Sequence, residues 1–166
     1  MKKEPLLISR CLLGEPCRYD GKRKTNAVAP EMLAALSEKY TLIPVCPECD
    51  GGLPTPRTPS ERTGERVLMK DGTDVTEAYI RGARAALAAG EAVSCHTALL
   101  KARSPSCGVG EIYDGTFTGR KVCRDGVTAE LLRRSGYRLY TEETVEKLLV
   151  QTEKFFGKTL EKKRKL

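Results

Sequence analysis

Cysteines are the side chains in this sequence most able to carry chemistry, and there are seven of them in 166 residues. Cys46 and Cys49 form a close pair in the stretch CPEC, and Cys107 lies between Ser-Pro-Ser and a glycine. A cysteine that serves only as a small apolar side chain usually sits inside a hydrophobic strand or helix. No periodic apolar pattern surrounds Cys107, so its placement indicates a ligand. The odd number of cysteines, with no recognisable secretory signal, argues against a disulfide framework.

Thiolates are soft ligands that select zinc, copper(I) or iron-sulfur clusters. A structural zinc site usually shows two close ligand pairs, whereas here one close pair is joined only by the looser Cys11 and Cys17. A redox-active Cys46/Cys49 pair is a second hypothesis, because C-x-x-C near alternating strands and helices is typical of thioredoxin-like proteins. It leaves Cys11 and Cys107 unexplained. The third hypothesis is a cluster held by three widely separated cysteines, which leaves one iron open to bind a substrate atom.

The charge and composition favour one globular domain with an anionic partner. The net charge is +7, and part of the excess lies in residues 154–166, which hold six basic residues against one acidic. We expect a single catalytic domain over residues 1–153, followed by this basic tail. An RNA-binding module with a structural metal is an alternative, but aromatic residues make up only 5% of the chain and tryptophan is absent, which disfavours single-strand binding. No long apolar run indicates a membrane span, so we expect a cytoplasmic protein.

Alternating strand and helix patterns predict the elements that must position these cysteines. Short apolar runs predict strands, and stripes at helical spacing predict the helices between them. The expected strands cover residues 6–13, 41–46, 92–100 and 137–141, and the expected helices cover residues 30–40, 73–90 and 127–136, with a last helix from Thr141 to about Phe156. Residues 53–64, which contain three prolines, are expected to be an irregular loop. This order predicts a three-layer α/β sandwich with a mostly parallel sheet.

Ligands of parallel α/β sheets bind beyond the carboxyl ends of the strands. Cys11 is expected near the end of the first strand, Cys46 at the end of the second, and Cys107 in the loop beyond the third. Because neighbouring strands lie about 4.8 Å apart, three such cysteines could meet around one small inorganic group.

Several long phrases in this sequence, in order from about residue 8 to residue 132, resemble the thiouracil desulfidase family. They are SRCLLGEPCRYDG, PVCPE followed by GGLPTPR, DVTEAYIRGA, LLKARSPSCG, and IYDGTFTG followed by DGVTAELL. The resemblance implies a Rossmann-like fold with a [4Fe-4S] cluster held by Cys11, Cys46 and Cys107. It also implies a reaction in which the fourth iron takes the sulfur of a thiolated pyrimidine and water replaces that sulfur, with no net redox change.

The same resemblance implies roles for other side chains. Glu48 would be the catalytic acid/base, and Ser104 would be a polar residue assisting at the substrate. Cys49 stands where the family motif commonly has an apolar residue. From its residue type alone, Arg57 could bind an anionic part of the substrate, although a loop arginine is more often exposed and solvated. The expected partner is a small thiolated nucleobase, with thiolated RNA as a possible larger substrate.

The other candidate groups are expected to be structural. Cys17, Cys95 and Cys123 are interpreted as free thiols. His96, the only histidine, has no partner pattern and is expected to play no chemical role. Asp114 is first a turn residue, because Asp-Gly suits tight-turn geometry.

Overall fold

The computed structural model describes residues 2–22 and 28–150. Its centre is a four-stranded sheet in the order β2-β1-β5-β8, and every neighbouring pair is parallel. The strands are β1 (Glu4–Ser9), β2 (Tyr40–Val45), β5 (Thr97–Leu100) and β8 (Arg138–Thr141). In the register, Leu7 of β1 lies opposite Ile43 of β2 and Ala98 of β5. The expected parallel α/β sheet is therefore confirmed.

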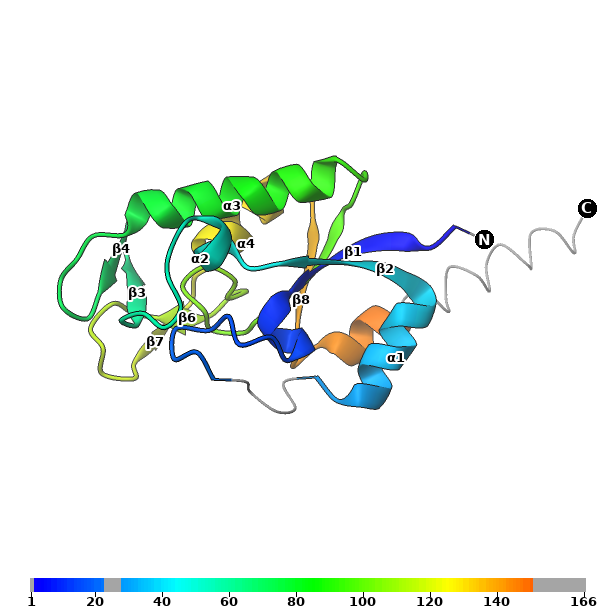
Figure 1. Ribbon diagram of the computed structural model, residues 1–166, viewed down its shortest axis with the longest axis horizontal. Helices are drawn as coiled ribbons and strands as arrows, with labels where there is room; N and C mark the ends of the chain where they lie inside the picture. The colour runs from blue at the N-terminus through cyan, green and yellow to red at the C-terminus, as the bar shows by residue number, and fades with distance from the viewer. Residues whose placement is uncertain (1, 23–27, 151–166) are drawn as a thin grey trace, which may run out of the picture.

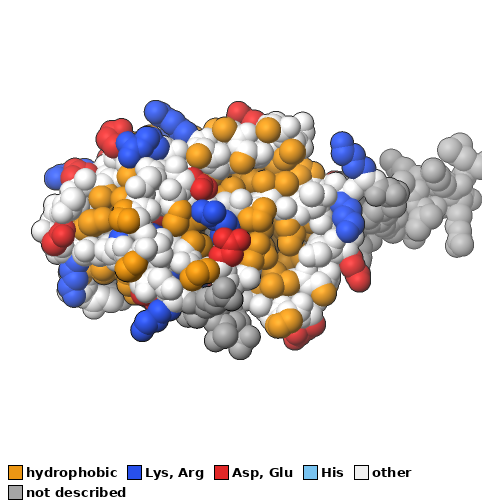
Figure 2. Space-filling view, in the orientation of Figure 1, with side chains coloured by type: hydrophobic (Ala, Val, Ile, Leu, Met, Phe, Trp, Pro, Cys, Tyr) orange, Lys and Arg blue, Asp and Glu red, His pale blue; other side chains and the backbone are white. Residues whose placement is uncertain are grey.

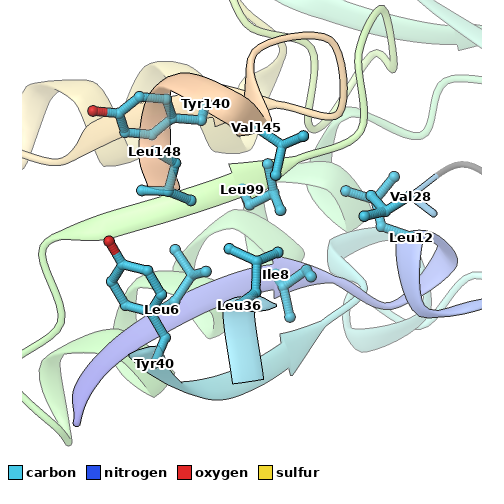
Figure 3. Packing of buried hydrophobic residues seen from close by; sticks show 10 residues of the cluster. All are labelled: Leu6, Ile8, Leu12, Val28, Leu36, Tyr40, Leu99, Tyr140, Val145 and Leu148. Atoms are coloured by element: carbon cyan, nitrogen blue, oxygen red, sulfur yellow. The ribbon is translucent and has the colours of Figure 1, made fainter. Parts of the chain in front are cut away.

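Helices cover both faces of this sheet (Figure 1). One face carries α3 (Thr76–Glu91) and α4 (Val127–Arg134), and the other carries α1 (Pro30–Lys39) and the helical residues 145–150. Strand residues alternate between the two cores, because successive side chains of a strand point to opposite faces. The core on the α1 side includes Leu6, Ile8, Leu36, Leu99, Val145 and Leu148 (Figure 3). The core on the α3 side includes Leu7, Ala86, Ala98, Leu100, Ala129 and Leu132. These layers confirm a Rossmann-like three-layer sandwich.

The helix boundaries follow local sequence signals. Pro30 occupies the first turn of α1, where its missing N–H costs no hydrogen bond. Before α3, the carboxylate of Asp74 accepts hydrogen bonds from the backbone N–H and the hydroxyl of Thr76. Expected helices over residues 30–40, 73–90 and 127–136 are confirmed, with ends that differ by a few residues. Of the last expected helix, residues 145–150 are helical, whereas Phe156 and the basic tail at 154–166 lie outside the described residues.

Several short elements were missed or misplaced by the sequence patterns. The first strand ends at Ser9, and the rest of its apolar run forms the 3-10 helix η1 (Arg10–Leu13), because such a run does not by itself distinguish a strand from a buried helical turn. The expected strand over 92–100 begins only at Thr97. The interpretation of 53–64 as wholly irregular is wrong for β3 (Ser60–Thr63), which pairs with β4 (Arg66–Met69). The remaining short elements are α2 (Pro47–Asp50), β6 (Ile112–Tyr113) and β7 (Lys121–Val122).

Among the described residues, no helix combines the length and the apolar character needed to cross a bilayer.

Candidate functional site

A cavity of about 520 Å³ opens at the carboxyl edge of the sheet. This volume lies in the range of sites for small molecules. Four cysteines line it, namely Cys11, Cys17, Cys46 and Cys107. Its other walls come from the loops after β1 and β5, from β3, and from the hairpin formed by β6 and β7.

The three cysteines expected as ligands follow three neighbouring strands. Cys11 lies in η1, two residues after β1 ends, and Cys46 directly follows β2 at the start of α2. Cys107 lies in the loop after β5. Because β2, β1 and β5 are adjacent in the sheet, all three reach the same cavity. The structure thus brings together the cysteines that the sequence placed at one edge.

This donor set fits a soft metal group. All seven cysteines are free thiols, so none of the three is consumed in a disulfide. Within residues 2–22 and 28–150, no three His, Cys, Asp or Glu side chains are arranged to hold a single metal ion. The zinc hypothesis therefore finds no preformed site in these segments.

Burial and mutual contact favour the protonated thiols of Cys17, Cys46 and Cys107 when no metal is bound. Burial raises the pKa of Cys107 to about 12. Interaction with the Cys11 thiol, together with burial, raises the pKa of Cys17 to about 11. The pKa of Cys46 is also raised, by its contact with the Cys17 thiol and by burial. A metal group that binds thiolates here would displace protons.

Cys17 is a free thiol, as expected, but its position in the site was not predicted. It is buried in the cavity wall and interacts with the thiols of Cys11 and Cys46. Cys49 differs from its neighbour Cys46 because it does not line the cavity. The Cys49 Sγ instead lies 3.5 Å from the Thr55 hydroxyl and 3.6 Å from the carbonyl oxygen of Cys17.

The loop that carries Cys107 is held by its own serine and by α4. The Ser104 hydroxyl oxygen accepts hydrogen bonds from the backbone N–H groups of Ser106 and Cys107, both at 3.1 Å. At the start of α4, the N–H of Thr128 donates to the Ser106 carbonyl at 2.8 Å. A Cβ on Gly126 would lie 2.6 Å from that carbonyl, so only glycine permits this approach. Ser104 lines the cavity as expected, and it also fixes the Cys107 backbone.

Close packing against α3 places α2, the short helix that begins after Cys46. A Cβ on Gly82 of α3 would lie 1.8 Å from the Pro47 carbonyl oxygen, and a Cβ on Gly51 would lie 2.0 Å from that of Ala78. The two helices therefore approach through backbone contact at both glycines. This contact fixes the position of Glu48, the second residue of α2.

The Glu48 carboxylate is held by three side chains. The fully buried Tyr79 hydroxyl donates to Oε1 at 2.7 Å, and Nη2 of Arg57 lies 3.3 Å from the same oxygen. The Ser106 hydroxyl donates to Oε2 at 3.4 Å and also lies 3.5 Å from the Cys107 Sγ. Glu48 lines the cavity, so its carboxylate is fixed beside the thiols. Neither Tyr79 nor Ser106 was predicted from the sequence to be a site residue, although the Ser-Pro-Ser-Cys run contains Ser106.

The side chain of Arg57 is buried, and the expectation of a solvated loop arginine is wrong. Its side chain is 2% exposed, and it donates hydrogen bonds to the carbonyl oxygens of Cys17 and Pro54, both at 3.1 Å. Burial alone would lower the pKa of Arg57, but the Glu48 carboxylate, together with the nearby Cys49, Tyr79 and Cys46 groups, outweighs burial, and the pKa is raised. Arg57 lies behind Glu48 and does not line the cavity. Its place suits an anchor for Glu48 better than a contact for an anionic substrate.

The remaining candidates lie away from the cavity or have structural contacts. Cys95 is buried, and its thiol donates to the carbonyl oxygens of Pro5 and Thr97. Cys123 is an exposed thiol. His96 precedes β5, at the opposite end of the strand from Cys107, and makes an edge contact with Tyr137. The carboxylate of Asp114 accepts the N–H of Thr116, which confirms the expected turn.

Basic side chains do not gather in one area on the face shown in Figure 2. Lys and Arg side chains there are interspersed with acidic and apolar ones. This face of the described residues lacks the basic stripe that is typical of nucleic-acid binders.

Comparisons with known proteins found a matching family model, a similar sequence and a similar structure. Residues 6–144 match the family model described as 2-thiouracil desulfurase. The chain is 41% identical over 154 residues to the uncharacterised protein YbbK of Bacillus subtilis (strain 168), covering 87% of this chain and 99% of that protein. It is 43% identical to a solved structure of the [4Fe-4S]-dependent thiouracil desulfidase TudS, with a TM-score of 0.85 over 91% of this chain and 99% of that one. The resemblance first seen in the sequence motifs is therefore confirmed.

Proposed function

This chain belongs to the 2-thiouracil desulfurase family, and from that premise we propose that it removes sulfur hydrolytically from a thiolated pyrimidine such as thiouracil. The products are the corresponding oxo-pyrimidine and hydrogen sulfide. Carbon, sulfur and iron keep their formal oxidation states between substrates and products, so no external reductant is needed.

Cys11, Cys46 and Cys107 would hold the [4Fe-4S] cluster. This assignment is supported because the three cysteines follow adjacent strands, line one cavity and are free of disulfides. When bound, such a cluster supplies a Lewis-acidic iron without a protein ligand, which suits the soft sulfur of a thiocarbonyl. Four-iron clusters in proteins are otherwise usually held by four cysteines.

Glu48 is the group in this cavity best placed to move protons. Tyr79 and Arg57 fix Oε1, Oε2 accepts a longer hydrogen bond from Ser106, and the residue lines the cavity. It would take a proton from the attacking water and later return it to the leaving sulfur or to a ring nitrogen. The Ser106 hydroxyl, which contacts Glu48 and Ser104, keeps that carboxylate oriented.

Ser104 would assist at the substrate with its hydroxyl proton. Its oxygen already accepts two backbone N–H groups, and this leaves the O–H free to turn toward Ser106 or toward a bound substrate. A hydrogen bond donated to the polarised heterocycle would stabilise negative charge that develops as water attacks.

The observation that carries this proposal is that the three cysteines proposed as ligands, all of them free, meet one anchored carboxylate, Glu48, in a single cavity. The test is turnover of 2-thiouracil in oxygen-18-labelled water by protein purified without oxygen. We expect labelled uracil and one sulfide per uracil. Uracil without the label, or sulfur retained on the protein as a persulfide, would contradict hydrolytic desulfurisation.

A thiolated RNA is the larger substrate to compare. The same assay with a short RNA that contains 2-thiouracil shows whether the enzyme also acts on the pyrimidine when it is part of an RNA chain. A free base or nucleoside that reacts several-fold faster than the RNA supports the small-molecule substrate, and the reverse order supports RNA.

A further inference from the structure

Glu61 is a buried carboxylate that has no role in the reaction proposed above. It belongs to β3, is 7% exposed and lies in the wall of the same cavity as the cysteines. Its Oε2 accepts one hydrogen bond, from the backbone N–H of Phe117 at 2.9 Å. Phe117 belongs to the loop between β6 and β7, which lines the cavity as well.

Glu61 has no basic partner within ion-pair distance among residues 2–22 and 28–150. Other shielded carboxylates in these segments have one: Glu48 pairs with Arg57, Glu142 with Lys101 and Glu130 with Arg62. A buried charge without compensation is costly, and one backbone N–H compensates only in part. Burial and the nearby Asp114 carboxylate raise the pKa of Glu61, although the Phe117 N–H opposes this rise.

An unpaired acceptor in a cavity wall is complementary to a ligand that brings an N–H group. The cavity is proposed to take a thiolated pyrimidine, and 2-thiouracil has a ring N–H on each side of its thiocarbonyl. A neutral N–H donor satisfies the Glu61 carboxylate without placing a second charge in the site. A ring methylated at that nitrogen loses the donor and leaves the acceptor unpaired.

We propose that Glu61 is a substrate-binding residue that accepts a hydrogen bond from a ring N–H next to the thiocarbonyl. This inference rests on the proposed function for the identity of the substrate. Through Glu61, β3 would distinguish thiolated pyrimidines that carry this ring N–H from those that lack it. Sites built to bond an N–H reject analogues lacking it, because the buried partner is then left unsatisfied.

Glu61 also fastens the β6–β7 loop through Phe117, so the experiment must separate recognition from support. Glu61→Gln keeps an amide oxygen that can accept the Phe117 N–H and removes the negative charge. Gly115→Ala is the matched control, since a Cβ there would lie 2.6 Å from the Thr63 Cβ and displace the same loop while keeping the carboxylate. Iron content and the visible spectrum are compared first, to show that all three proteins carry the same cluster.

The measured quantity is the ratio of kcat/KM for 2-thiouracil to that for its 1-methyl and 3-methyl derivatives. In the wild type, we expect one of the two methyl groups to lower kcat/KM several-fold, mainly through KM. Glu61→Gln should lose most of this discrimination, and Gly115→Ala should keep it even if both rates fall. The inference is overturned if neither methyl group matters in the wild type, or if Glu61→Gln discriminates as the wild type does.

Equilibrium binding gives a second readout that does not depend on turnover. Uracil has the same ring N–H groups and is not consumed, so its Kd and those of its methyl derivatives are measured by calorimetry. If thiouracil is not turned over but uracil binding still depends on one N–H and on Glu61, the proposed reaction fails and the assignment of Glu61 stands. If thiouracil is turned over but methylation has no effect, the assignment of Glu61 alone fails. If uracil is not bound and thiouracil is not turned over, both fail.

Discussion

The Tyr79 hydroxyl donates a hydrogen bond of 2.7 Å to Oε1 of Glu48, and it does so from a fully buried position in α3. Glu48 lies on a different element, the short helix α2, so this bond fixes the candidate acid/base from behind. Because Arg57 contacts the same oxygen, Oε1 is anchored twice and the carboxylate cannot rotate freely.

Removing only the Tyr79 hydroxyl should therefore impair turnover without removing the cluster. We expect Tyr79→Phe to lower kcat by about 10-fold or more, the order of a lost hydrogen bond to a charged group, with little change in KM. Steady-state kinetics and iron content measure the two effects. Tyr137→Phe is the control, since Tyr137 is also buried but lies beside Cys95, outside the cavity. Equal losses in both variants, or a Tyr79→Phe loss that persists in a Glu48→Gln background, would show that Tyr79 does not act through Glu48.

Replacing Glu48 itself with Gln should abolish most turnover and keep the cluster. The amide preserves the shape of the side chain but cannot take a proton from water, and general acid–base catalysis typically contributes about 10²–10⁴-fold. Sulfide release and the visible spectrum of Glu48→Gln are the measurements. Activity close to that of the wild type would remove Glu48 from the mechanism.

A methyl group at Gly82 should displace α2 and weaken the site. Its Cβ would collide with the Pro47 carbonyl, and overpacking of this kind costs about 1–3 kcal/mol of unfolding free energy. Because Cys46 and Glu48 move with Pro47, Gly82→Ala should also bind less iron. Gly90→Ala in the same helix is the control, as its Cβ would meet the Tyr137 side chain, away from the cavity. Denaturant unfolding and iron content should both change in Gly82→Ala, and only stability should change in Gly90→Ala. Unchanged iron content in Gly82→Ala would contradict the positioning role.

Ser104 should matter for the Cys107 loop as well as for the substrate. Ser104→Ala removes the acceptor of two backbone N–H groups, at a cost of about 1–3 kcal/mol for each one left without a partner. We expect this variant to lose iron faster in air than the wild type, whereas Ser104→Thr, which keeps the hydroxyl, should hold it. Cluster loss is followed by visible absorbance. If Ser104→Ala holds iron as well as the wild type while turnover falls, the role of Ser104 is confined to the substrate.

Asp125 should make stability depend on pH. Burial alone would raise its pKa, but hydrogen bonds from the Arg133 guanidinium and the Gly110 N–H, together with the positive charges of Arg133 and Arg62, outweigh burial and hold the pKa below its ordinary value. A lowered folded-state pKa stabilises the protein above the unfolded value, and this contribution is lost as pH falls through the folded value. The difference in unfolding free energy between the metal-free wild type and Asp125→Asn should therefore be large at neutral pH and shrink in acid. A difference that is constant with pH would contradict this linkage.

The sequence was enough to predict the α/β sandwich, because apolar strands and amphipathic helices alternate with the correct periods. It also placed Cys11, Cys46 and Cys107 at one edge, since that step needs only parallel strands. It could not assign Cys17 or Tyr79 to the site, because both reach the site through tertiary packing that leaves no local pattern. Arg57 was misjudged for the same reason: a proline-rich loop suggests exposure, and only the fold shows that it is buried against Glu48.

The most direct test of the three-cysteine site is the iron and acid-labile sulfide content of protein purified without oxygen. It should be measured for the wild type and for single alanine variants of Cys11, Cys17, Cys46, Cys49 and Cys107. We predict one four-iron cluster in the wild type, lost on replacement of Cys11, Cys46 or Cys107 and kept in Cys17→Ala and Cys49→Ala. A wild type that binds no iron after reconstitution, or a cluster that survives loss of Cys46 but not of Cys17 or Cys49, would contradict this ligand set.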